Sequence, residues 1–141
     1  MKRRMCAAAA LCCALVLTAC GMTPQTAARR VERDQAELTQ IVQQVTQARS
    51  VDGVQYDGAR RVVFVQDTGM VEFVCDAWGF ASQTASSGFY YSPGGVPLGF
   101  DGADLALVPE NGGWRWDEDG GDNWYYTERL CGNWFFYEMH F

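Results

Sequence analysis

The chain has 141 residues, a length typical of one domain, and its 11 basic and 17 acidic side chains give a formal net charge of −6. This acidic balance disfavours a nucleic-acid partner, because phosphate binding needs clustered Lys and Arg. Hydrophobic residues make up 48% of the chain and aromatic residues 13%, which excludes an intrinsically disordered chain.

The first twenty residues have the pattern of an export signal. A short basic start, MKRRM, precedes an apolar run from Cys6 to Val16. This run has the length of a secretory signal and is too short to span a bilayer. It ends in the segment LTAC at residues 17–20, which resembles the lipobox of bacterial lipoproteins.

The lipobox resemblance implies a modification and a location. Residues 1–19 would be a lipoprotein signal peptide, cleaved before Cys20, whose sulfur would carry a diacylglyceryl group. The protein would then be anchored to the cell membrane and face away from the cytoplasm. Two acyl chains give durable anchoring, since each buried methylene contributes about 0.8 kcal/mol. An ordinary secretory signal and an uncleaved anchor are the alternatives.

Removal of residues 1–19 leaves two cysteines besides Cys20, namely Cys75 and Cys131. An even pair outside the cytoplasm predicts a disulfide. Alternation of apolar residues along the segment from Met70 to Ala77 also points Cys75 inward. Two free thiols with a redox role are the competing interpretation.

The start of the mature chain predicts an amphipathic helix. We assign residues 20–26 to the lipid anchor and a short tether, and residues 27–50 to the helix. Thr23 and Pro24 suit a helix start, and Asp52-Gly53 a stop. The apolar residues recur at spacings of three and four: Val31, Leu38, Ile41, Val42, Val45 and Ala48. Such a stripe usually packs on a core, and a helix lying on the membrane is the alternative.

Residues 51–141 hold all 19 aromatic residues and predict an antiparallel β domain that forms a single domain with the helix. Short β-type runs alternate with Gly-containing turns, and closely spaced strands pair antiparallel. The expected strands are 54–56, 61–66, 70–77, 88–92, 105–108, 114–117, 124–130 and 134–140. We therefore expect an α+β fold, with one N-terminal amphipathic helix packed on an antiparallel meander that is either open or a partial barrel.

Three aromatic segments carry a second resemblance. GFYYSP at 88–93, GDNWYY at 121–126 and WFFYE at 134–138 look like segments of small uncharacterised lipoproteins from Gram-positive bacteria. The resemblance implies a lipoprotein domain family. It transfers no functional residue beyond Cys20.

Two-residue turns at 120–121 and 132–133 would place Trp116 opposite Tyr125, and Tyr125 opposite His140. One sheet face would then carry the candidate ligand-binding residues Trp114, Trp116, Tyr125, Arg129 and His140. Aromatic faces with polar handles suit glycans and proteins, which makes this face a candidate platform. Packing into a core or an interface is the alternative.

Candidate metal ligands lie in and after the acidic turn near residue 120: Asp117, Asp119, Asp122 and Glu128. Their spacing partly matches a calcium loop. However, Gly121 stands where a ligand belongs, and Asp122 stands where a glycine belongs. A hairpin turn whose acids keep a sheet edge soluble is the alternative, and we expect no cofactor.

The sequence supplies no catalytic constellation. His140 is the single histidine, and no nucleophile-elbow, phosphate-loop or zinc-helix motif is present. We therefore expect a lipid-anchored extracytoplasmic binding module for an unknown glycan or envelope protein rather than an enzyme. A structural envelope lipoprotein is the second hypothesis, and a small carboxylate-dependent hydrolase is the third.

Overall fold

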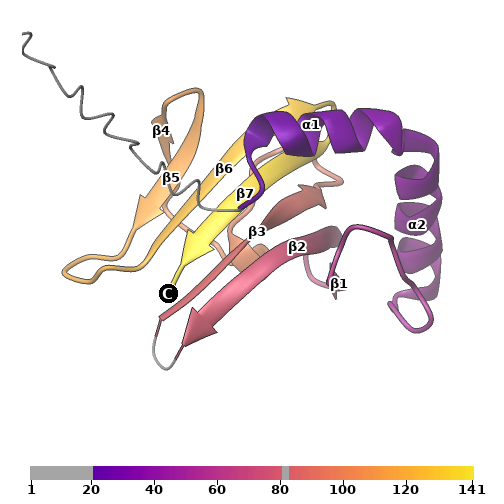
Figure 1. The fold of residues 1–141 in the computed structure, drawn as a ribbon, viewed down its shortest axis with the longest axis horizontal. Helices are drawn as coiled ribbons and strands as arrows, with labels where there is room; N and C mark the ends of the chain where they lie inside the picture. The colour runs from indigo at the N-terminus through magenta and orange to yellow at the C-terminus, as the bar shows by residue number, and fades with distance from the viewer. Residues whose placement is uncertain (1–20, 81–82) are drawn as a thin grey trace, which may run out of the picture.

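The computed structural model describes residues 21–80 and 83–141, which form an α+β fold with helices on one face of an antiparallel sheet (Figure 1). The α+β prediction is confirmed. The predicted signal peptide and Cys20 lie outside the described residues.

The helical segment begins where its capping residues favour it. Helix α1 spans Pro24–Arg33, with Pro24 in its first turn. The Thr23 hydroxyl accepts a hydrogen bond from the Thr26 amide, and the Thr26 side chain accepts one from the Thr23 amide. Residues 24–26, which we had assigned to a tether, are therefore helical.

The predicted single helix is two helices, which corrects the sequence-based expectation. α2 spans Gln35–Ala48 and turns sharply away from α1 (Figure 1). The break falls at Asp34, whose φ of −105° and ψ of 18° are not helical. Its carboxylate accepts hydrogen bonds from Arg33 and, at 2.6 Å, from the Tyr56 hydroxyl. The apolar stripe continues through this break, so the spacing of hydrophobic residues gave no sign of it.

Seven strands form the sheet, in the order β1-β2-β3-β7-β6-β5-β4. Their bounds are β1 Arg61–Val65, β2 Met70–Phe80, β3 Gln83–Tyr91, β4 Val108–Glu110, β5 Gly113–Asp117, β6 Trp124–Cys131 and β7 Trp134–His140. A 3₁₀ turn, η1, spans Phe100–Gly102.

The sheet is two short meanders joined in the middle, and not one continuous meander. β7 pairs with β3, so that Tyr91 lies opposite Trp134 and Ala85 lies opposite His140. The sheet is open, with β1 and β4 as its edges. Residues 54–56 form a loop rather than a strand, and of the predicted strand 105–108 only Val108 lies in β4.

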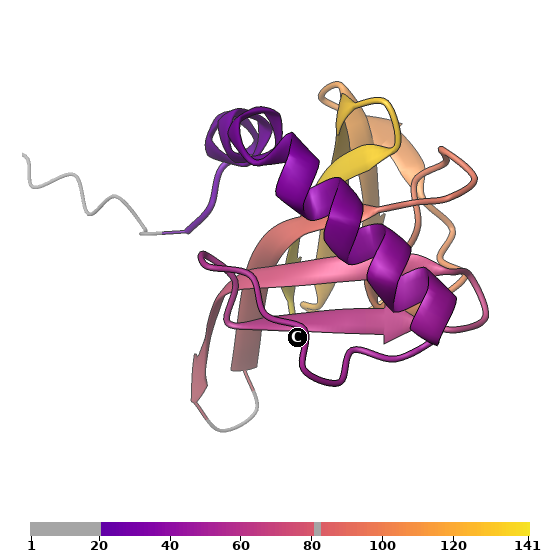
Figure 2. The same cartoon turned by 90° about the vertical axis from the view of Figure 1, so that its right-hand side faces the viewer.

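Both faces of the sheet are packed. α1 and α2 cover one face, and Figure 2 shows α2 running diagonally across it. The core on that face includes Val31, Leu38, Val45, Phe73, Phe89 and Phe136. On the opposite face, residues 96–107 cover a second cluster built on Met70, Tyr90, Tyr125, Phe135 and Tyr137. Most of the aromatic residues in the sheet therefore serve packing.

Candidate functional site

The predicted ligand-binding face is divided between the two sides of the sheet. Trp116 lies opposite Tyr125, as the turn position predicted. A bulge between Arg129 and Cys131 then shifts the β6–β7 register by one residue, so Tyr125 lies opposite Met139. A shift of one residue reverses the side on which a side chain points. The prediction that His140 shares a face with Tyr125 is therefore wrong.

The predicted aromatic platform is a packed surface. Tyr125 is fully buried, and its hydroxyl donates a hydrogen bond of 3.0 Å to the Leu98 carbonyl. The Phe100 ring of η1 lies 6.4 Å from the Trp116 ring and 6.1 Å from the Tyr125 ring. Trp114 is half-buried in the same cluster. These side chains pack with Leu98 and Phe100 and hold residues 96–107 on the sheet, so their main contacts serve the fold.

Arg129 also serves the fold. Its guanidinium lies over the Phe135 ring, 4.6 Å from the centroid, and donates a hydrogen bond of 2.6 Å to the Gly95 carbonyl. It thus ties β6 to the turn that follows β3. Of the five candidate ligand-binding residues, His140 alone lies outside this packed region.

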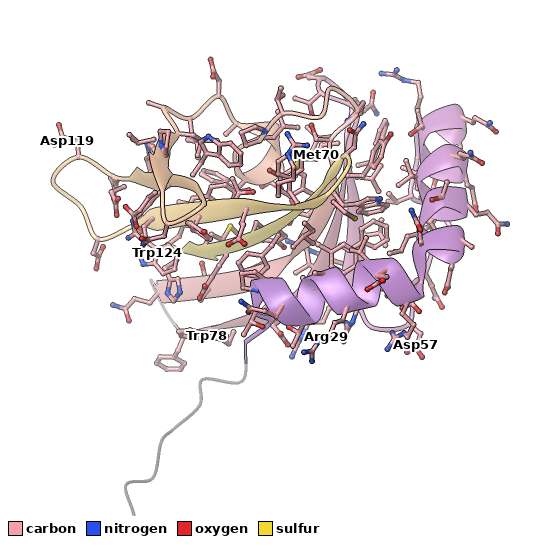
Figure 3. The ribbon with its side chains drawn as sticks, turned by 90° about the horizontal axis from the view of Figure 1, so that it is seen from above. Arg29, Asp57, Met70, Trp78, Asp119 and Trp124 are labelled. Atoms are coloured by element: carbon pink, nitrogen blue, oxygen red, sulfur yellow. The ribbon has the colours of Figure 1, made fainter. Side chains whose placement is uncertain are left out.

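His140 belongs to a second aromatic group that sequence reasoning missed. On the helix-bearing face, Trp124 lies opposite His140, His140 opposite Ala85, and Ala85 opposite Trp78. The Trp124 and His140 rings stack at 4.2 Å, and the Trp78 ring meets the His140 ring edge-on at 5.7 Å. We call Trp78, His140 and Trp124 the aromatic row. Trp78 and Trp124 lie at the same end of the molecule in Figure 3.

The aromatic row is exposed at Trp78 and half-buried at His140 and Trp124, because the helices cover only the other half of this face. α1 and α2 pack over Phe73, Phe89 and Phe136, whereas Trp78 is 62% exposed. The sequence did contain a signal for Trp78. Trp78 and Phe80 are β-favouring aromatic residues that extend β2 past Ala77, where our predicted strand stopped. The bulge between Val74 and Asp76 then turns Trp78 to the helix-bearing face, whereas strict alternation from Phe73 would place it on the other face.

Two grooves flank the aromatic row. The end groove has a volume of about 460 Å³ and lies at the ends of the strands. It combines the rings of Trp78, Trp124, His140 and Phe141 with the polar side chains of Gln83, Thr84, Asp122 and Asn123. The face groove has a volume of about 320 Å³ and is lined by Gly21, Trp78, Ala85, Ser86, Ser87, Glu138 and His140. Trp78 and His140 line both grooves.

Fixed charges support one end of the row. The Arg115 guanidinium lies 4.6 Å from the Trp124 ring centroid, so one cation already stacks on this indole. Two Arg115 nitrogens donate hydrogen bonds of 2.7 and 2.8 Å to the Asp117 carboxylate. This hydrogen bonding lowers the pKa of Asp117. At the other side, His140 Nε2 lies 3.3 Å from Glu138 Oε1.

The predicted calcium ligands do not form a site. Within residues 21–80 and 83–141, no group of three or more His, Cys, Asp and Glu side chains is placed to hold a metal ion. The Asp117 carboxylate accepts hydrogen bonds from Arg115, and Glu128 accepts a hydrogen bond of 2.8 Å from the Tyr126 hydroxyl. Asp119 lies at the far tip of the β5–β6 hairpin (Figure 3). Asp119 and Asp122 therefore occupy a solvated turn, whereas Asp117 and Glu128 lie in the flanking strands β5 and β6.

The predicted disulfide is not formed, because Cys75 is a buried free thiol and Cys131 an exposed one. Cys75 lies at a bulge in β2, and β3 and β7 separate that strand from β6. The two cysteines are therefore separated by three strand spacings of about 4.8 Å each. This distance is larger than the roughly 7 Å that a disulfide allows between Cα atoms. Alternation predicted the inward phase of Cys75 but carried no information on strand order. Burial raises the pKa of Cys75 to about 11, which makes its thiol unreactive.

Comparisons with protein-family models, curated proteins and solved structures gave no match. Among the described residues, no helix is long and apolar enough to cross a membrane.

Proposed function

We propose that the chain is a lipid-anchored extracytoplasmic binding module whose ligand occupies the end groove. The observation that carries this proposal is the aromatic row, which lies partly exposed on the half of this face that the helices leave uncovered. A groove of about 460 Å³ beside it is in the size range of small-ligand sites. The anchor rests on the LTAC segment at residues 17–20 and on the exposure of Gly21, the first described residue.

An uncharged glycan is the ligand class that this groove suits best. The exposed Trp78 ring offers an apolar surface for a sugar ring, while the amide and hydroxyl groups of Gln83, Thr84 and Asn123 can bond sugar hydroxyls. Asp122 adds a carboxylate, which accepts hydrogen bonds from hydroxyl groups and repels anionic ligands. A carboxylate-dependent hydrolase has less support, because glycosidases use two carboxyl groups and Asp122 is the single acid that lines this groove among the described residues.

The lipid anchor is tested by metabolic labelling with an alkyne fatty acid. We expect the label on the wild type and its loss in Cys20→Ala. Equal labelling of the two proteins would refute the anchor.

The groove is tested by screening the mature lipoprotein, held in detergent micelles, on a glycan array. Two alanine substitutions in the same β5–β6 turn form a matched pair. Asp122 lines the groove and Asp119 does not. For any glycan that binds, we expect Asp122→Ala to weaken binding about tenfold, as befits a lost hydrogen bond to a charged group. Asp119→Ala should stay within twofold.

Two results would contradict glycan binding at this groove. One is an array on which nothing binds, and the other is an equal effect of the two substitutions. The first of these would favour a structural envelope lipoprotein without a small ligand.

A further inference from the structure

We propose that the exposed end of β2, with Trp78 and Phe80, rests in the headgroup region of the lipid bilayer and holds the domain in one orientation. This inference rests on the proposed lipid anchor at Cys20 and adds to it a second membrane contact. Trp78 lines both grooves, so the side of its ring in the face groove, beside Gly21, meets the lipid, and the side in the end groove stays available to the glycan. The partner surface is the bilayer itself.

The first step is that the chain has almost no slack between the anchor and the fold. Met22 is 8% exposed within the core on the helix-bearing face, and its amide donates a hydrogen bond of 3.3 Å to the Ser87 hydroxyl of β3. Thr23 then caps α1. One residue, Gly21, therefore separates Cys20 from a fixed position. Since a residue spans at most about 3.6 Å, the lipidated sulfur cannot move far from the surface around Ser87.

The second step is what that surface carries. Gly21 and Trp78 line the same groove, so the chain emerges beside the exposed end of β2. Phe80 is 91% exposed and Trp78 62% exposed. Large exposed apolar side chains grouped together mark interaction sites. A Trp ring has an apolar body and a polar N–H, and Trp is enriched where lipid meets water.

The third step concerns charge. Arg29 is exposed on α1 and lies on the same side of the molecule as Trp78 (Figure 3). Glu138 lies on the intervening sheet surface and lines the face groove. The attraction of Arg29 to lipid phosphate and the repulsion of Glu138 oppose each other. The contact is therefore mainly apolar, and zwitterionic lipid suffices for it.

The experiment uses the mature lipoprotein in phosphatidylcholine vesicles whose acyl chains carry bromine, which quenches nearby tryptophan fluorescence. We expect clear quenching in the wild type and in Trp124→Phe. Trp78→Phe should lose at least two thirds of the quenching, because it removes the reporter at the contact and keeps an aromatic ring there. Quenching in Trp78→Phe that equals the wild type would overturn the proposal.

A second pair of variants tests the contact without changing a tryptophan. Phe80→Ser removes the exposed ring at the end of β2, and Val108→Ser removes an apolar side chain of β4 that is 62% exposed. We expect Phe80→Ser to reduce the quenching at least twofold and Val108→Ser to leave it unchanged. Equal effects of the two substitutions would contradict a specific membrane contact.

Vesicle flotation separates failure of the orientation from failure of the anchor. A wild type that floats with the vesicles but shows no quenching would overturn the contact at the end of β2 and leave the anchor intact. A wild type that does not float would overturn both. A photoreactive phenylalanine analogue at position 80 tests self-association. If it cross-links to a second copy and the wild type shows no quenching, the exposed rings serve self-association and the bilayer is rejected as partner.

Discussion

The carboxyl group of Glu72 should make the protein less stable as the pH rises from 4.5 to 7. Glu72 lies in β2 between Val63 of β1 and Tyr90 of β3, and it is 4% exposed. Its side chain lies on the sheet face that residues 96–107 cover. Burial raises its pKa from 4.5 to about 7, and the negative charge of Asp101 adds to this effect. The Tyr137 hydroxyl and the Arg61 guanidinium act in the opposite direction.

The sign of the effect follows from proton binding. Between pH 4.5 and 7 the folded chain keeps the Glu72 proton and the unfolded chain releases it. The free energy of unfolding therefore falls as the pH rises through this window, and it levels off above pH 7. A pKa shift of this size corresponds to about 3 kcal/mol.

Glu72→Gln retains the shape of the side chain and removes its titration. We expect the variant to match the wild type within about 1 kcal/mol at pH 4.5 and to exceed it by up to about 3 kcal/mol at pH 8. Urea unfolding followed by tryptophan fluorescence measures both values. The exposed Glu118→Gln serves as control and should follow the wild-type pH profile. Parallel pH profiles for Glu72→Gln and the wild type would refute the reasoning.

Two further substitutions test other contacts. The Tyr56 hydroxyl donates a 2.6 Å hydrogen bond to Asp34, so Tyr56→Phe should lower the free energy of unfolding by about 1.5–3 kcal/mol in urea titrations. The Tyr126 hydroxyl is partly solvated, so Tyr126→Phe should lower the free energy of unfolding by less. Equal losses in the two variants would argue against a special role for the contact at Asp34, between α1 and α2. Trp116→Ala should lower the free energy of unfolding by about 2–3 kcal/mol, since its ring packs with Phe100 and Phe141, and should leave glycan affinity within twofold. If Trp116→Ala instead loses glycan affinity and keeps the wild-type free energy of unfolding, Trp116 belongs to the ligand site.

Local sequence signals predicted what depends on neighbouring residues. The suitability of Thr23 and Pro24 for a helix start and the pairing of Trp116 with Tyr125 are both confirmed, although the assigned helix range began three residues late, at residue 27. The turn between β5 and β6 is longer than two residues but is centred on the same position, residues 120–121, so the register is unchanged.

The missed features depend on contacts between distant segments. One extra residue in β6, between Arg129 and Cys131, moved His140 to the other face, and strict alternation cannot reveal such a bulge. The pairing of β3 with β7 also has no local signal, because no turn joins the two strands. The end groove requires this pairing, since it gathers Thr84 of β3, His140 of β7 and Trp124 of β6. Strand order had to be known before the groove could be found.

The central position of β7 has a consequence for how the chain reaches its native state. Residues 134–140 fill the gap between β3 and β6, so the hairpins before them cannot join into one sheet until this segment arrives. A chain that leaves the ribosome or an export channel from its N-terminus therefore remains in two unjoined parts until late. Contacts of such long sequence separation slow folding, because the loop that they close must lose its entropy first. The sheet of this chain can therefore close only after residues 134–140 have emerged.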